Sequence, residues 1–143
     1  MDVDIRRFEP GDRAAVVELW GRAELTRPWN DPELDINRKI AVDPEGFLVA
    51  ELAGRVVGTV MAGYDGHRGW LNYLAVDPDT QGHGLGGRLV REAEHVLARR
   101  GCPKINLQIR TSNEAAVEFY RSIGYELDDV VSMGRRLVDD EQG

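Results

Sequence analysis

The stretch that decides the fold is Leu74-Ala75-Val76-Asp77-Pro78-Asp79-Thr80-Gln81-Gly82-His83-Gly84-Leu85-Gly86-Gly87-Arg88-Leu89. Its pattern predicts a strand ending at Val76, a glycine-dense turn, and a helix that opens directly after the turn. The first N–H groups of a helix have no partner within it and lie at the positive end of its dipole. Glycines leave room for an anion to reach those groups. The stretch therefore predicts a turn that binds a phosphate or pyrophosphate.

Two familiar phosphate-binding motifs do not fit this turn. The spacing of Gly82, Gly84 and Gly87 matches the dinucleotide fingerprint, but that motif places its first glycine directly after the strand and an acidic residue about 20 positions later. The next predicted strand offers Gln108 and Arg110 instead. A P-loop is excluded because it requires a Lys-Ser or Lys-Thr pair after its second glycine. A turn without a ligand is disfavoured, since each glycine costs about 1 kcal/mol relative to alanine.

Hydrophobic periodicity on both sides of this turn predicts one domain over residues 1–143. Its fold class is α/β, with a mixed sheet that is antiparallel early and has a crossover in the middle. The order is strand, helix, helix, three strands, helix, strand, helix, two strands. The expected strands span 3–8, 47–52, 55–64, 70–76, 104–109, 125–128 and 131–137, and the expected helices span about 14–25, 32–42, 85–101 and 113–123.

Composition and charge limit the classes of function. The chain has 143 residues, a net charge of −7 and 42% hydrophobic residues, which is typical of a globular protein. The acidic balance disfavours nucleic acid as a partner and weakly favours basic substrates. No long apolar run or signal peptide is present, and Cys102 is the only cysteine. We therefore expect a cytoplasmic protein without a membrane segment or intrachain disulfide.

The motif Gln81-x-x-Gly84-x-Gly86, after a strand ending in Val-Asp-Pro, resembles the acetyl-CoA signature of the GNAT family of N-acetyltransferases. A second block also resembles that family, because Tyr120 follows Asn113 by seven positions and Gly124-Tyr125 comes next. The run 107–113 is most similar to the ribosomal-protein N-terminal alanine acetyltransferases. The specific part of the resemblance covers residues 74–125.

The resemblance implies a GNAT-like acyl-CoA N-acyltransferase fold that uses acetyl-CoA and an amine acceptor, and it leaves a homodimer open. The implied activity is direct transfer of the acetyl group to a primary amine, either a small amine or a protein N-terminus, in a ternary complex. The alternative is an acetyl-CoA-binding sensor or partner module with weakened catalysis. The residues implied to hold the coenzyme are Leu74, Ala75 and Val76 for pantetheine, Gln81, Gly82, His83, Gly84, Leu85, Gly86, Gly87 and Arg88 for the pyrophosphate, and Asn113.

The chemistry of the implied reaction assigns roles to Tyr120 and Gln108. The leaving thiolate gains from a proton donor, and a phenol with a pKa of about 10 is protonated at neutral pH. By resemblance, Tyr120 is that donor. In the alanine acetyltransferases a glutamate acts as the base at the position that Gln108 occupies. An amide cannot accept the proton, so we expect Gln108 to orient the amine or a water molecule.

The resemblance implies that the loop before the second helix borders the acceptor, which makes Trp29, Asp31 and Glu33 candidate substrate-binding residues, together with Asn72 on a central strand. Candidate bases are Asp31, Glu33, Asp65 or a chain of water molecules. The positions of the three carboxylates better suit structural roles, as first-turn helix acids for Asp31 and Glu33 and as a turn residue for Asp65. His67, His83 and His95 share no ligand spacing with one another or with Cys102, so no metal is expected.

Overall fold

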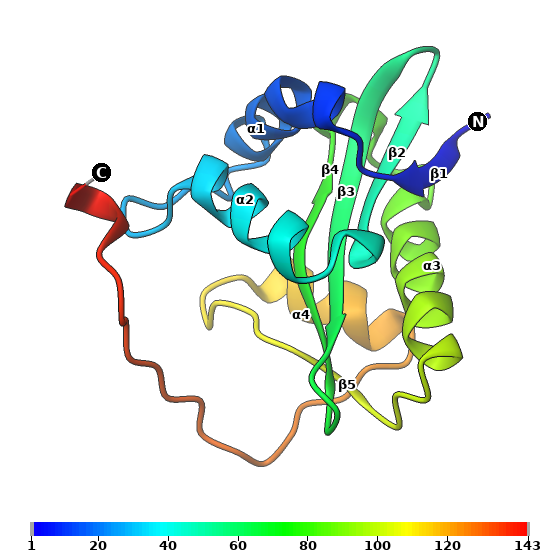
Figure 1. The fold of residues 1–143 in the computed structure, drawn as a ribbon. Coiled ribbons are helices and arrows are strands. Elements are labelled where there is room, and N and C mark those ends of the chain that lie inside the picture. The colour runs from blue at the N-terminus through cyan, green and yellow to red at the C-terminus, as the bar shows by residue number, and fades with distance from the viewer. Residues whose placement is uncertain (1, 143) are drawn as a thin grey trace.

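The computed structural model describes residues 2–142 and is built on one five-stranded mixed sheet (Figure 1). Its strand order follows the sequence: β1 (Asp4–Arg7), β2 (Phe47–Leu52), β3 (Arg55–Tyr64), β4 (Gly69–Val76) and β5 (Ile105–Leu107). Neighbouring strands are antiparallel from β1 to β4, whereas β5 is parallel to β4. The predicted fold class is confirmed, including the crossover in the middle of the chain.

Helices cover both faces of the sheet (Figure 1). Helices α1 (Arg13–Arg22) and α2 (Pro32–Val42) pack on one face through a cluster centred on Trp20, Ile36 and Phe47. Helix α3 (Leu85–Arg99) packs on the other face, beside α4 (Glu114–Ser122). Gly58 permits the close approach of α3, because a Cβ there would lie 2.8 Å from Leu89 Cδ1. Within residues 2–142, no helix has the length and apolar character needed to cross a membrane.

A buried ion pair ties α1 to the turn that follows β4. The Asp77 side chain has no exposed surface and forms an ion pair with Arg22 of α1. Arg55 Nη2 lies 3.5 Å from Asp77 Oδ2 and makes a second ion pair. Its Oδ1 also accepts a hydrogen bond from the Asp79 amide at 2.8 Å. Burial by itself would raise the pKa of Asp77, but the Asp79 amide and Arg22 outweigh it and lower that pKa. Asp77 therefore stays ionised and fixes where the glycine-rich turn begins.

A bulge in β4 changes the direction of the strand near its middle. Asn72 pairs with Met61 and Ala75 with Thr59, so Tyr73 and Leu74 lie opposite a single residue of β3. Tyr73 has a φ of 52°, in the left-handed region that aromatic residues rarely adopt. Its ring stacks on Trp20 at 3.8 Å between centroids, and its carbonyl accepts a hydrogen bond from Thr59 Oγ1 at 2.8 Å. These contacts hold the strained residue in place.

The two strands expected at 125–128 and 131–137 do not form, and β5 is shorter than the expected 104–109. After α4 the chain runs without regular structure along the outside of the molecule and ends beside α2 (Figure 1). A strand needs a ladder partner for its backbone groups. In the described part of the chain, residues 125–137 form no backbone ladder with β5 and meet this region through side chains, such as Asp128 with Lys104 and Ser132 with Gln108, so neither expected strand is realised.

Candidate active site

The strands β4 and β5 separate toward the end that carries the glycine-rich turn. They pair only at three positions, from Gly69 with Ile105 to Leu71 with Leu107. Beyond Leu71, the backbone groups of β4 that face β5 have no strand partner among the described residues. Leu74, Ala75 and Val76, the residues expected to hold pantetheine, lie in this unpaired part. An extended amide-containing chain can pair with such an edge as a further strand would.

The turn after β4 presents a set of unpaired backbone amides. The segment consists of a short 3-10 turn, Pro78–Thr80, the glycine-rich residues 81–84, and the first turn of α3. Within residues 2–142, none of the amides from Gln81 to Gly87 donates to a protein acceptor. No side chain caps the start of α3 either. Consecutive free amides at a helix N-terminus suit a pyrophosphate.

The glycines of this turn leave the space that an anion would need. Gly82 and Gly84 have φ values of 88° and 73°, a conformation that glycine adopts without strain. A Cβ at either position would meet no protein atom within 4 Å. A Cβ at Gly86 would instead lie 3.2 Å from Phe119 Cζ, so that glycine serves the contact between α3 and α4. The turn fits a pyrophosphate, with Gly82 and Gly84 lining the open side.

Other residues expected in the phosphate site have structural contacts of their own. The Leu85 side chain is buried in the core, which leaves only its amide for a ligand. The Arg88 amide donates to the Gly84 carbonyl at 3.2 Å, and its guanidinium donates to the Val3 carbonyl at 3.1 Å. His83 is exposed. The amides available to a phosphate therefore end at Gly87.

Helix α4 carries the two residues of the second motif. Asn113 caps this helix, since its Oδ1 accepts a hydrogen bond from the Ala116 amide at 3.1 Å. The Tyr120 ring makes edge contacts with Phe119 and Tyr125, at centroid distances of 5.0 and 5.6 Å. Phe119 packs against the core, as expected for a structural aromatic residue.

The Tyr120 hydroxyl is suited to donate a proton. It makes no hydrogen bond to any described residue, so its proton is free for a ligand. Burial raises the pKa of Tyr120 to about 12. The nearby Tyr125 differs, because its hydroxyl donates to Glu94 Oε2 at 2.7 Å. Of these two phenols on the same aromatic cluster, Tyr120 is the one left available for chemistry.

Gln108 and Tyr120 line the same groove, which has a volume of about 1580 Å³ and lies between β5, α4 and the C-terminal segment. The Gln108 amide nitrogen donates to Ser132 Oγ across this groove. The two residues that the sequence assigned to catalysis are thus brought to one side of the molecule. Gln108 is exposed, so an acceptor can reach it.

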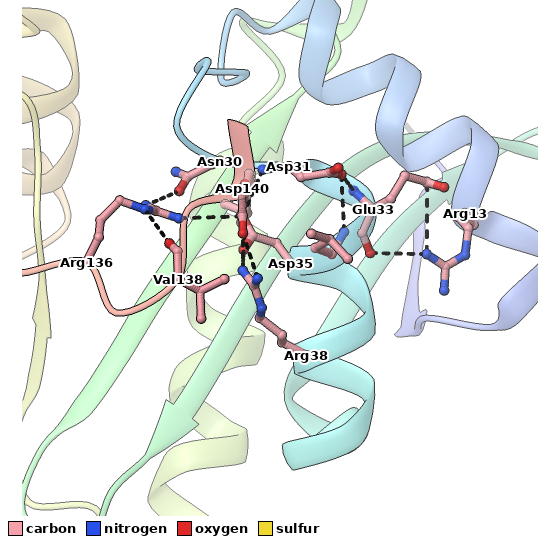
Figure 2. Close-up of polar contacts among 11 residues, drawn as sticks. Arg13, Asn30, Asp31, Glu33, Asp35, Arg38, Arg136, Val138 and Asp140 are labelled. Atoms are coloured by element: carbon pink, nitrogen blue, oxygen red, sulfur yellow. Dashed lines mark hydrogen bonds and ion pairs between the residues drawn. The ribbon is translucent and has the colours of Figure 1, made fainter. Parts of the chain in front are cut away.

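The loop between α1 and α2 lies against the chain that follows β5. The Arg110 guanidinium sits 5.0 Å above the centre of the Trp29 ring, and Trp29 remains 39% exposed. Asp31 caps α2 through hydrogen bonds from the Glu33 and Leu34 amides, and the Glu33 carboxylate is 3.9 Å from Arg13 (Figure 2). Trp29 therefore borders the segment that follows β5, while Asp31 and Glu33 make contacts that fix α2.

The remaining candidates lie at two different places along the hairpin of β3 and β4. Asn72 is exposed and lies next to the bulge. Asp65 lies in the β3–β4 turn, at the opposite end of β4 from the glycine-rich segment. Its carboxylate accepts from the amides of Arg68 and His67, which lower its pKa. This location removes Asp65 from the candidate bases. Among residues 2–142, no group of three or more His, Cys, Asp or Glu side chains could hold a metal ion.

The sequence did not single out Asp35 and Tyr73. Tyr73 Oη donates to Asp35 Oδ2 at 2.5 Å, which joins α2 to the bulge of β4. Burial, together with this bond to a carboxylate, raises the pKa of Tyr73. No sequence signal pairs the two residues, because the contact depends on how α2 crosses the sheet. The bond holds the Asp35 carboxylate beside the bulge of β4.

Comparisons with known proteins agree with this geometry. The model of the acetyltransferase (GNAT) family matches residues 14–125. An acetyltransferase from Sodalis glossinidius is 50% identical over 141 residues, 98% of this chain and 99% of the relative. Ard1 from Thermoplasma volcanium shares the fold with a TM-score of 0.81 and 26% identity, over 90% of this chain and 85% of that one. The ribosomal-protein-S18-alanine N-acetyltransferase from Escherichia coli has a TM-score of 0.71 and 25% identity, over 85% of this chain and 76% of that one. The chain therefore belongs to the GNAT family and is an acetyltransferase.

Proposed function

We propose that the enzyme transfers the acetyl group of acetyl-CoA to a primary amine that attacks it directly in a ternary complex. The observation that carries the proposal is the run of unpaired amides from Gln81 to Gly87, next to the unpaired edge of β4. The free amides of the turn suit a pyrophosphate, and the unpaired edge of β4 suits an extended chain that contains amides. Coenzyme A contains both a pyrophosphate and such a chain. The acceptor would enter beside Trp29, Asn72 and Gln108.

Acetyl-CoA would supply an activated acyl group as a thioester. Asn113 and the glycine-rich turn would hold the coenzyme, and the free Tyr120 hydroxyl would give its proton to the sulfur as the carbon–sulfur bond breaks. Gln108 would orient the amine or a water molecule by hydrogen bonding. The Asp35 carboxylate, which accepts a hydrogen bond from Tyr73 Oη beside the bulge of β4, is a further candidate to receive the proton of the amine.

A sensor or partner module that binds acetyl-CoA without turning it over is the competing proposal, and the absence of a carboxylate at Gln108 is the observation that favours it. An assay for release of free thiol from acetyl-CoA distinguishes the enzyme from the binding module. The acceptors tested are peptides with different N-termini, polyamines and small amines. Release above the rate without acceptor supports the enzyme and identifies the acceptor class. Tight binding of acetyl-CoA by calorimetry with no release from any amine supports the module.

Introducing a carboxylate by Gln108→Glu is expected to move the rising limb of the pH–rate profile to lower pH. A glutamate can take the amine proton directly, so the reaction no longer depends on the fraction of amine already deprotonated. Gln108→Ala is the matched control. It removes the orienting amide without adding a base, so we expect the whole profile to fall with its shape unchanged.

These profiles are measured as kcat/KM against pH with the best acceptor from the panel. A limb that stays in place in Gln108→Glu, while Gln108→Ala also leaves the rate unchanged, would mean that position 108 does not face the amine. Asp35→Asn then becomes the informative variant, because it removes the charge of the carboxylate on Tyr73 and retains its shape.

A further inference from the structure

Arg110 is a charged side chain at the groove that has no counter-ion. It follows β5 by three positions and lines the same groove as Gln108 and Tyr120. Its guanidinium lies over the Trp29 ring and makes no hydrogen bond or ion pair with any residue from 2 to 142. A guanidinium stays charged at neutral pH, so this cation is available to an anionic group of a ligand.

Trp29 holds this guanidinium without engaging its hydrogen-bond donors. The Arg110 Cζ atom lies 5.0 Å from the centre of the ring, within the distance at which a cation is attracted to an aromatic face. This attraction does not use an N–H group, so the donors of the guanidinium remain free. They form a planar fork that matches the two oxygens of a carboxylate. The contact with Trp29 therefore favours the binding of a carboxylate at this place.

The carboxylates of the loop that carries Trp29 are engaged elsewhere (Figure 2). Asp31 accepts hydrogen bonds from two amides of the first turn of α2, at 2.9 and 3.3 Å. The Glu33 carboxylate lies 3.9 Å from Arg13 Nη1. This loop therefore supplies no carboxylate to the guanidinium of Arg110.

The acidic side chains of the groove do not pair with this guanidinium either. They are Glu94, Glu126 and Asp128. Asp128 Oδ2 is 3.0 Å from the Nζ of Lys104, which precedes β5, whereas Arg110 follows it. Glu94 accepts a hydrogen bond from the hydroxyl of Tyr125, the residue before Glu126, at 2.7 Å. No acidic residue that lines the groove thus neutralises Arg110.

We propose that the acceptor is a primary amine that carries a carboxylate near its reacting nitrogen, and that Arg110 binds this carboxylate. The inference rests on the proposed function, because it uses the place between Trp29 and Gln108 where the acceptor would enter. Gln108 would orient the amine while Arg110 holds the carboxylate, and two such contacts restrict how the amine approaches the thioester. Salt screens the net charge of −7 beyond about 10 Å, so the direct contact with Arg110 dominates.

Two matched pairs of acceptors test this assignment. Alanine and alaninamide differ in a carboxylate on a small amine, and peptide amides that begin Ala-Asp and Ala-Asn differ in the charge of the second side chain. For each pair, kcat/KM of the carboxylate-bearing acceptor is divided by that of the neutral one, with thiol release as the signal. Amine basicity is the same for every enzyme tested, so it cancels when these ratios are compared between variants. The pair whose ratio responds identifies a free amino acid or a peptide as the source of the carboxylate.

Arg110→Met is expected to lower the ratio of one pair about 10-fold, the lower end of the range for a hydrogen bond between charged groups, because the site is open to water. Arg110→Glu should lower it further, since two carboxylates repel each other. Arg121→Met is the matched control. Arg121 also lines the groove and is exposed, but it lies on α4, on the other face of the sheet from α1 and α2 (Figure 1). This variant should keep the wild-type ratio.

A purely structural role for the contact between Arg110 and Trp29 gives a different result, because both acceptors of a pair then slow equally and the ratio stays constant in Arg110→Met. That result overturns the assignment, as does an equal change of the ratio in Arg121→Met. Thiol release from polyamines or other amines without a carboxylate, and from neither pair, overturns it as well and leaves the proposed function standing. No release from any amine means that the proposed function itself fails, and this inference with it.

Discussion

Tyr120→Phe is expected to slow acetyl transfer about 10²- to 10⁴-fold while leaving affinity for acetyl-CoA nearly unchanged. The substitution keeps the ring and its edge contacts with Phe119 and Tyr125, and removes only the hydroxyl. That hydroxyl bonds to no described residue and burial holds its pKa at about 12, so its loss removes a proton donor without breaking a structural contact. Single-turnover measurements should be used, because slow product release would hide part of the effect.

Tyr125→Phe is the matched control, since it removes a phenol hydroxyl from the same aromatic cluster. Its hydroxyl donates to Glu94, so this variant should lose about 1–3 kcal/mol of stability and keep its rate. Thermal unfolding and single-turnover rates should therefore differ between the two variants: Tyr120→Phe loses rate and keeps its stability, whereas Tyr125→Phe loses stability and keeps its rate. A Tyr120→Phe rate within a factor of two of wild type would assign Tyr120 to packing and leave the leaving sulfur without a protein donor.

Local sequence signals were sufficient for most of the fold. The pair Ala53-Gly54 adopts positive φ at both positions, as a tight hairpin turn requires, and it places the ends of β2 and β3 where the pattern predicted them. Apolar residues at helical spacing, including Leu85, Leu89 and Leu97, predicted the buried face of α3. Such features depend on residues close in the sequence, so they can be read without knowledge of the tertiary structure.

Features that depend on distant residues were not predictable. The bulge at Tyr73 is stabilised by Trp20 and Thr59, which belong to other elements, and the bond between Asp35 and Tyr73 joins a helix to a strand. The segment 131–137 is a second example. Its alternating pattern indicates which side chains would share a face of a strand, but it does not indicate whether these residues form a ladder with another strand.

The glycine-rich turn gives the second large effect: Gly84→Asn is expected to weaken acetyl-CoA binding about 10- to 100-fold. Gly84 has a φ of 73°, and asparagine tolerates this left-handed conformation better than other residues with a Cβ. The new side chain meets no protein atom at its Cβ, so it would project into the space where the pyrophosphate is proposed to lie. Losing one charge-assisted hydrogen bond costs about 1.5–3 kcal/mol, which corresponds to this change in affinity.

Gly101→Asn tests the same substitution at the other end of α3. Gly101 has a φ of 82°, and a Cβ there also meets nothing within 4 Å, so both variants place the same side chain on the same kind of backbone. Their unfolding temperatures should therefore fall by similar amounts, because the conformational cost is shared. Titration calorimetry with acetyl-CoA should separate them, since only Gly84 lies among the unpaired amides at the start of the helix. Equal affinities in the two variants would mean that the pyrophosphate does not lie at this turn, and the coenzyme site would have to be sought elsewhere along the unpaired edge of β4.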